Sequence, residues 1–298
     1  MTTPGGPSTA LHRPGTVGEA VASLAAEARA GRPVELLAGG TDLVPALRTG
    51  TRRPAVIVAL RRVLELRVRG AGADTLTIGA GVTYTELAGW SLSPGLAATS
   101  RVVGSVQIRN CGTVGGALGS ANPRGDLLTF LTAAQAEVLI TSESGSRAAG
   151  LDDFLNTGRL PGELVTAVRV PRPSGPQTYL KIGGRQAAFP SLVSCALLVD
   201  RVRERVCCAV GGVAARPWRV AEAERLAADV DWSTGTAPTG LARRFGELAA
   251  ADVRAAPPLG EDPRHPLEYR VHAAGVLAAR AFARCLAPRA APHREDTP

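Results

Sequence analysis

Two glycine-pair segments stand out in this sequence, because their residue types suit the binding of an anion. The first is Ala38-Gly39-Gly40-Thr41-Asp42-Leu43, which follows an apolar run at 34–37. Glycine tolerates backbone angles that other residues avoid, so successive N–H groups can converge on a phosphate oxygen. A helix beginning at Thr41 or Asp42 would add its N-terminal N–H groups. Taken alone, the segment fits an ordinary tight turn with a helix cap equally well.

The second segment is Thr113-Val114-Gly115-Gly116, followed by Ala117. It lies in a stretch at 104–123 that has little regular pattern and many Gly, Ser, Asn and Thr residues. We predict that this stretch is irregular and functional, since long irregular segments inside compact domains usually are. Asp126 then precedes a predicted helix at 127–135 and suits ribose or ribityl hydroxyls, with helix capping as the alternative.

The sequence lacks the motifs that several other kinds of site require. Neither glycine segment fits GxGxxG or GxxxxGK[ST], which disfavours Rossmann and P-loop sites. No CxxC pair is present, so we predict no iron–sulfur or zinc cassette and no metal site in this chain. No Ser/His/Asp or Cys/His constellation is apparent. The four histidines lie outside the candidate site: His12, His265, His272 and His293.

Composition places the chain among globular proteins. Its 298 residues suit about two domains, and a 45% hydrophobic content supports a sizeable core. The net charge of +8 comes from arginines spread along the chain among acids, so we expect no nucleic-acid partner. An odd, irregularly spaced set of five cysteines predicts a reduced cytoplasmic protein. We expect neither a signal peptide nor a membrane span.

The hydrophobic pattern predicts an α+β chain. A helix at 17–30 begins with the capping-box pair Thr16 and Glu19, and a second capped helix follows Thr83 and Glu86. Strands are predicted at 34–37, 55–60, 75–78, 138–141 and 164–170. A proline-rich linker at 171–176 precedes an antiparallel meander (177–182, 192–199, 205–213) and helices at 220–228, 240–250 and 267–286. We expect flexible tails at 1–10 and 287–298.

The ordered set of motifs resembles the FAD-binding medium subunit of molybdenum hydroxylases, the carbon monoxide dehydrogenase and xanthine dehydrogenase type. The resemblance spans roughly residues 11 to 285. Its residues are Leu36 to Leu43, Ile78-Gly79-Ala80, Gln107 to Asn110, Thr113 to Gly116, Asn122-Pro123, Asp126, Tyr179-x-Lys181 with Arg185, and Gly211 to Ala214 followed by Pro217. It implies a two-subdomain FAD-binding domain of the PCMH/VAO type at 11–171. An antiparallel sheet with helices would follow at 177–286.

The resemblance also implies which residues bind FAD. The two glycine segments would hold the pyrophosphate and adenosine, Ser120 and Asp126 would meet ribityl or ribose hydroxyls, and Val165 would lie against the isoalloxazine ring. Lys181 would sit near the pyrimidine edge of that ring, where reduced flavin carries negative charge. The full set implied as cofactor-binding is Ala38, Gly39, Gly40, Thr41, Asp42, Leu43, Val103, Thr113, Val114, Gly115, Gly116, Ala117, Ser120, Asp126, Val165 and Lys181.

By the same resemblance, the chain is an electron-transfer subunit that passes electrons from iron–sulfur clusters to an external acceptor. Its partners would be a molybdopterin-binding large subunit and a 2Fe–2S small subunit, with NAD, a quinone or oxygen as acceptor. Two departures keep a stand-alone FAD-dependent oxidase or dehydrogenase open as the alternative: Ala117 replaces the family's usual Asn, and Gly183-Gly184 replaces bulkier residues. A flavin-free relative is a third hypothesis. Covalent attachment of FAD through Cys111 also stays open.

Overall fold

The first layer of the molecule is a small parallel sheet. The computed structural model describes residues 9–184, 190–260 and 262–286. Strands β1 (Ala10–His12), β3 (Val56–Ala59) and β2 (Val34–Leu37) lie in the order β1-β3-β2, all parallel. Ala10 pairs with Val56, so the predicted tail at 1–10 is wrong at its inner end; residues 1–8 and 287–298 lie outside the described ranges.

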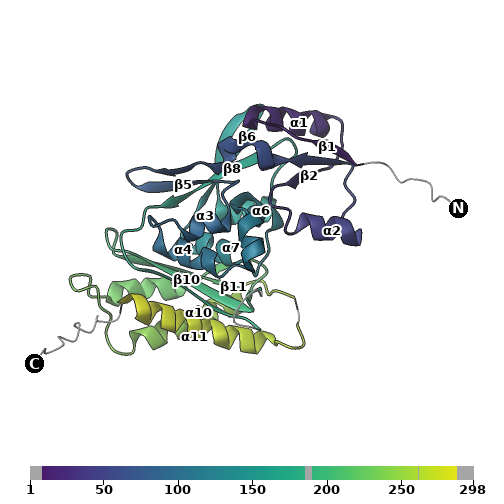
Figure 1. Cartoon of the computed structure of the whole chain (residues 1–298). Coiled ribbons are helices and arrows are strands. Elements are labelled where there is room, and N and C mark those ends of the chain that lie inside the picture. Colours follow the sequence, from purple (N-terminus) through teal and green to yellow (C-terminus); the bar gives the residue numbers. More distant parts are fainter. Residues whose placement is uncertain (1–8, 185–189, 261, 287–298) are drawn as a thin grey trace, which may run out of the picture.

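Helix α1 (Val17–Arg29) packs on this sheet through Ala20, Val21 and Leu24. Its Thr16 cap accepts a hydrogen bond from the Glu19 N–H at 3.1 Å. Only half of the predicted capping box forms, because the Glu19 carboxylate accepts from Gly15 instead. The short helix α2 (Leu43–Thr49) begins directly after the first glycine segment. The carboxyl end of β2 therefore leads straight into that segment (Figure 1).

The second layer is a five-stranded antiparallel sheet in the order β4-β5-β8-β6-β7. Its strands are β4 (Arg69–Ala71), β5 (Thr75–Gly79), β8 (Leu164–Pro171), β6 (Glu137–Ser142) and β7 (Gly145–Gly150). Two 3-10 turns, η1 (Leu60–Arg62) and η2 (Leu64–Arg67), connect β3 to β4, and α8 (Leu151–Thr157) follows β7. Fully buried Leu76, Ile78, Val138 and Val168 form the centre of this layer, as the apolar strand patterns require.

Short helices form the middle of the molecule: α3 (Tyr84–Ala88), α4 (Pro94–Arg101), α5 (Val106–Cys111), α6 (Val114–Ser120) and α7 (Asp126–Ala133). The capping box of Thr83 and Glu86 is confirmed. The prediction of an irregular stretch at 104–123 is wrong, because α5 and α6 occupy it. Ser105 and Thr113 cap these helices, and a high glycine content hid them from pattern analysis.

The C-terminal part contains an antiparallel sheet in the order β12-β11-β10-β9. The strands are β9 (Gln177–Ile182), β10 (Val193–Asp200), β11 (Arg205–Gly211) and β12 (Trp218–Arg219), which confirms the predicted meander. Helices α9 (Ala221–Glu224), α10 (Leu241–Ala255) and α11 (Leu267–Leu286) and the turn η3 (Arg225–Asp229) follow. Phe245 and Phe282 stack between α10 and α11, with ring centroids 4.6 Å apart.

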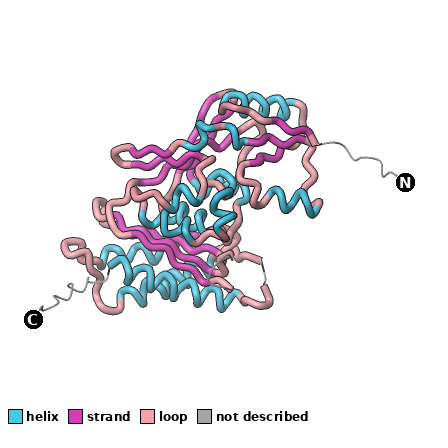
Figure 2. Tube along the Cα trace, in the orientation of Figure 1, coloured by secondary structure: helices cyan, strands magenta, loops and turns pink. Residues whose placement is uncertain are grey.

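The C-terminal sheet joins the two halves of the chain. Helix α11 packs on one face with α10 against it, while α4 and α7 pack on the other, so the sheet lies between two helical layers (Figures 1 and 2). Thr129 of α7 and Ser194 of β10 bond through their hydroxyls at 3.0 Å. A Cβ atom at Gly211 would stand 2.2 Å from the Thr129 hydroxyl, so this contact admits no larger residue. None of the helices described has the length and apolar character that crossing a membrane requires.

Candidate functional site

A cavity of about 1240 Å³ opens where the first two layers meet the middle helices. It is larger than most small-ligand pockets, which span about 300–1,000 Å³. Its wall includes the segments that follow β2 and β3, the start of α7 and the start of β8. The predicted residues on this wall are Ala38, Gly39, Gly40, Thr41, Asp42, Leu43, Val103, Thr113, Gly115, Gly116, Ala117, Ser120, Asp126 and Val165.

The first glycine segment presents free backbone donors to this cavity. Within the described residues, the N–H groups of Gly39 through Leu43 donate to no protein acceptor. Gly40 has a φ of 72°, which only glycine adopts without strain. Gly39 lies so close to the second segment that an added Cβ would stand 2.0 Å from the Cys111 carbonyl oxygen. This backbone is therefore shaped as an anion-binding nest.

Neither side chain predicted to cap α2 does so. Asp42 occupies the N-cap position without a side-chain bond to the helix, and Thr41 instead donates to the Asp42 carboxylate at 3.0 Å. The alternative of an ordinary tight turn with a helix cap therefore explains only how the chain turns at Gly39-Gly40. It leaves the row of unpaired N–H groups unexplained.

The second glycine segment has a different role from the first. Its N–H groups are already engaged: Val114 donates to Val82, Gly115 to Ala80 at 2.7 Å, and Gly116 to the Thr113 hydroxyl at 3.1 Å. A second nest of free N–H groups, as the sequence suggested, is therefore not formed. Gly116 instead offers bare surface, because a Cβ there would meet only the Thr113 hydroxyl within 4 Å.

Asp126 is the most heavily bonded polar side chain on the cavity wall. It is 7% exposed. It accepts hydrogen bonds from the Tyr179 hydroxyl at 2.6 Å, the Lys181 ammonium at 2.9 Å and the Ser191 hydroxyl. Burial, together with the neighbouring Asp126 carboxylate, raises the pKa of Tyr179 well above its usual value. The capping role is excluded, since Asp126 makes no cap bond in α7.

Two predicted residues lie off the cavity wall. Val114 is fully buried in the core, and its N–H is bonded as described above. Lys181 donates to the Val102 carbonyl at 2.8 Å and to Asp126, so it reaches the cavity only through that carboxylate. Gly183 and Gly184 do not line the cavity either. Arg185, part of the motif, lies outside the described residues.

Sequence reasoning missed most of the charge on this wall. Five arginines line the cavity: Arg52, Arg61, Arg67, Arg124 and Arg159. Arg52 pairs with Glu35 and Arg67 with Glu86, whereas Arg61 pairs with no carboxylate in the part of the chain described. Dispersed arginines carry no periodic signal, so only the folded chain brings them together. Their excess over the wall's acids favours a ligand with negative charge.

Tyr84 is a further wall residue that the sequence did not single out. Its ring lies against Gly112, the residue before the second segment, where an added Cβ would stand 2.6 Å from the ring. Burial, with Asp42 and Asp126 adding to it, raises the pKa of Tyr84, so the hydroxyl stays protonated as a hydrogen-bond donor.

Comparison with family models gives two matches. Residues 7–173 match the FAD binding domain in molybdopterin dehydrogenase, and residues 178–285 match the CO dehydrogenase flavoprotein C-terminal domain. The carbon monoxide dehydrogenase medium chain of Afipia carboxidovorans is 30% identical over 289 residues, covering 93% of this chain and 96% of the relative. The glyceraldehyde dehydrogenase medium chain of Sulfolobus acidocaldarius is 34% identical over 200 residues, covering 63% and 71%.

Solved structures agree with these sequence matches. Reconstituted CO dehydrogenase from Oligotropha carboxidovorans superposes with a TM-score of 0.82 at 28% identity, covering 96% of this chain and 100% of the matched one. Quinoline 2-oxidoreductase from Pseudomonas putida 86 has a TM-score of 0.81 at 22% identity, covering 94% and 97%, and supports the fold alone. The two-part α+β architecture expected from the sequence is confirmed.

Proposed function

Because this chain belongs to the family of FAD-binding medium subunits of molybdenum hydroxylases, we propose that the cavity described above holds its FAD. The family membership makes the chain an FAD-dependent oxidoreductase subunit that transfers electrons. The proposed FAD-binding residues are those of the cavity wall, together with Lys181 acting behind Asp126. Val114 would act by shaping the second segment, because its side chain is buried in the core and its N–H donates to the Val82 carbonyl.

The observation that carries this proposal is the row of free N–H groups from Gly39 to Leu43. A dinucleotide has its negative charge at the pyrophosphate, in its middle, so a nest on one side wall suits a ligand that extends both ways from it. The cavity volume of about 1240 Å³ suits a ligand as large as a dinucleotide. Gly116 lines the cavity without a side chain, which leaves room for the ligand there. The residues present thus fit FAD.

Each part of the wall would have its own task. The free N–H groups bind the pyrophosphate, and the surrounding arginines lower the cost of bringing its charge into a partly buried site. Asp126, fixed by Tyr179 and Lys181, offers its cavity-facing edge to hydroxyls. Bound FAD would supply reversible acceptance and release of electrons, which side chains alone do not provide.

The partners of this electron-transfer step follow from the family. We propose that a molybdopterin-binding large subunit oxidises the substrate and that a 2Fe–2S small subunit delivers electrons to this chain. NAD, a quinone or oxygen would be the acceptor. A cytoplasmic location is supported by the five cysteines, all of them in described segments and all free thiols.

The stand-alone oxidase gains no support from the matched proteins, whose names describe medium chains of larger enzymes. The decisive experiment is co-purification. A tagged chain co-expressed with its neighbouring genes is expected to elute with two further subunits and a flavin spectrum. A yellow chain that elutes alone and oxidises a small molecule would favour the stand-alone enzyme. A chain that stays colourless with added FAD would exclude both.

A further inference from the structure

Arg159 is a cation on the cavity wall whose hydrogen-bonding capacity the protein only partly uses. Its Nη1 donates to the carbonyls of Leu160 at 3.3 Å and Glu163 at 2.8 Å. Among the described residues, its Nε and Nη2 have no partner. These two nitrogens are not among the buried atoms that lack a hydrogen bond, so they remain accessible to solvent. Arg159 therefore has donors available to a ligand.

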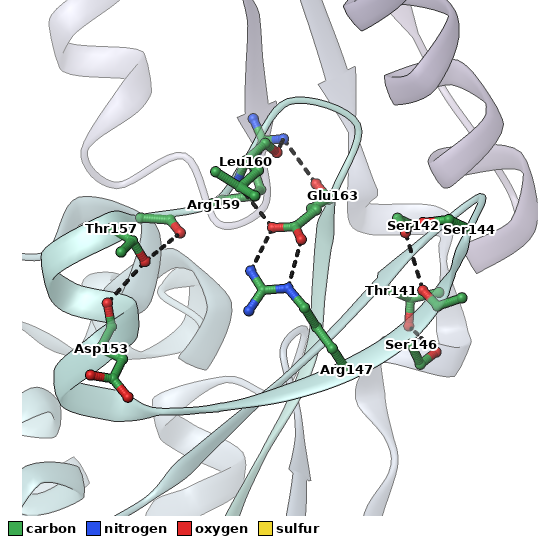
Figure 3. A network of polar contacts seen from close by, with 12 residues as sticks. Thr141, Ser142, Ser144, Ser146, Arg147, Asp153, Thr157, Arg159, Leu160 and Glu163 are labelled. Carbon is green, nitrogen blue, oxygen red and sulfur yellow. Dashed lines mark hydrogen bonds and ion pairs between the residues drawn. The ribbon is translucent and has the colours of Figure 1, made fainter.

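The guanidinium of Arg159 is held by two backbone carbonyls of the turn at 160–163, and a buried carboxylate, that of Glu163, holds this turn. Glu163 receives two bonds from Arg147, Nε at 2.7 Å and Nη2 at 2.9 Å, and a third from the Leu160 N–H at 3.0 Å (Figure 3). Its own carbonyl holds Arg159. Glu163 thus anchors the turn between α8 and β8 from both ends. An arginine placed by such a network loses less freedom when it binds a ligand than a free side chain would.

The location of Arg159 separates it from the Lys181–Asp126 pair. The turn that holds Arg159 packs on the N-terminal layer, since a Cβ added to Gly162 would stand 3.7 Å from the Cα atom of Ala25 in α1. Arg159 and Glu35 both line the cavity, and the Glu35 carboxylate partly opposes the lowering of the Arg159 pKa by burial. Glu35 belongs to β2 of the N-terminal sheet, whereas Lys181 belongs to β9 of the C-terminal sheet. These sheets lie at opposite ends of the molecule, with the middle helices between them (Figure 1). The nest that receives the pyrophosphate follows β2, so FAD would extend from it toward both regions.

We propose that Arg159 binds the adenine ring of FAD at the β2 end of the cavity, with Glu163 and Arg147 as positioning residues. This rests on the proposed FAD site. A planar guanidinium stacks on aromatic rings and donates to ring nitrogens, which suits adenine. The flavin half then points toward Asp126 and Lys181. Val165, two residues beyond Glu163 in β8, also meets the adenosine half instead of the isoalloxazine ring.

The test separates the two halves of the cofactor. FAD, ADP and FMN are titrated calorimetrically into the full-length apo-protein and into Arg159→Ala, Arg159→Lys and Glu163→Gln. Arg62→Ala is the control, since Arg62 is an exposed arginine outside the cavity wall. We expect Arg159→Ala to weaken ADP and FAD about tenfold and to leave FMN unchanged. The ADP and FAD affinities of Arg159→Lys should fall between those of the wild-type chain and Arg159→Ala, because lysine keeps the positive charge but lacks the planar guanidinium.

Glu163→Gln should weaken ADP binding with the same ADP-to-FMN selectivity, which a general loss of folding would not produce. Circular dichroism and thermal unfolding establish that each variant folds. The inference would be overturned if Arg159→Ala lost affinity only for FMN, lost affinity equally for ADP and FMN, or lost affinity for neither. So would a wild-type chain that binds FAD but not ADP. A wild-type chain that binds no FAD would instead contradict the proposed function, and the two failures are therefore distinguishable.

Discussion

Lys181 of β9 and Asp126 of α7 form an ion pair, with the Nζ of Lys181 2.9 Å from Oδ2 of Asp126, at the place where the two halves of the chain meet. Both side chains are mostly buried, and the carboxylate also lines the cavity. The pair therefore links the C-terminal sheet to the cofactor site. Motif order connected the two residues to the same ligand, whereas the structure shows that they contact each other.

Lys181→Met is expected to destabilise the protein by about 3 kcal/mol, because it leaves Asp126 buried without its cation. Tyr179→Phe removes a neutral donor from the same carboxylate and should cost about 1 kcal/mol. Urea-induced unfolding of the apo-protein measures both. If both substitutions lower the free energy of unfolding equally, the ion pair contributes no more to stability than the hydrogen bond from Tyr179.

The two glycine segments should respond differently to alanine. Gly116→Ala is expected to fold and to weaken FAD at least tenfold, because Gly116 lines the cavity and its added Cβ, 3.1 Å from the Thr113 hydroxyl, takes up room at the wall. Gly39→Ala should lower the thermal midpoint of the apo-protein, since its Cβ would collide with the Cys111 carbonyl. Gly70→Ala in β4 is the control, because a Cβ there meets nothing within 4 Å and Gly70 does not line the cavity. Wild-type FAD affinity in Gly116→Ala would contradict the placement of the cofactor.

Alkylation should distinguish Cys111 from the buried cysteines. Cys111 is exposed and lines the cavity, so iodoacetamide is expected to modify it first, and bound FAD should slow that reaction. Burial raises the pKa values of Cys207, Cys208 and Cys285, which keeps these thiols protonated and slow. Mass spectrometry of samples taken over time, with and without FAD, measures the alkylation rate of each cysteine. An FAD-independent rate at Cys111 would place the cofactor elsewhere.

The Glu163 network should make stability depend on pH. The hydrogen bonds from Arg147 hold the pKa of Glu163 below its ordinary value, despite the opposing effect of burial. A depressed folded-state pKa stabilises the protein above the unfolded-state value of about 4.3, and this stabilisation is lost as the pH falls through the lower folded-state value. Glu163→Gln should therefore cost about 1–3 kcal/mol at pH 7 and progressively less in acid. A difference in unfolding free energy that stays constant from pH 7 to pH 3 would refute this.

Ala117 lies on the cavity wall, at the position for which the resemblance in sequence motifs implies an Asn. Ala117→Asn is expected to strengthen FAD binding by about tenfold, equivalent to about 1.4 kcal/mol, by adding an amide donor beside the second segment. Ala117→Leu is the comparison, because it adds volume without a donor and should weaken binding. If Asn weakens FAD as much as Leu does, the local backbone here has adapted to alanine.

Local patterns in the sequence predicted many of the helices and strands and the position of the first nest, but not α5 and α6. Periodic apolar residues predicted β2, β8, the meander and α11, and Gly39-Gly40 predicted the turn, because these signals depend on neighbours along the chain. The tertiary structure decided what depends on distant residues. It shows that Gly115 packs on Ala80, that Asp126 is bonded by Tyr179, Lys181 and Ser191, and that Arg159 reaches the cavity. Hydrogen bonding and close packing between segments far apart in the chain leave no local pattern, so only folding reveals which backbone donors remain free for a ligand.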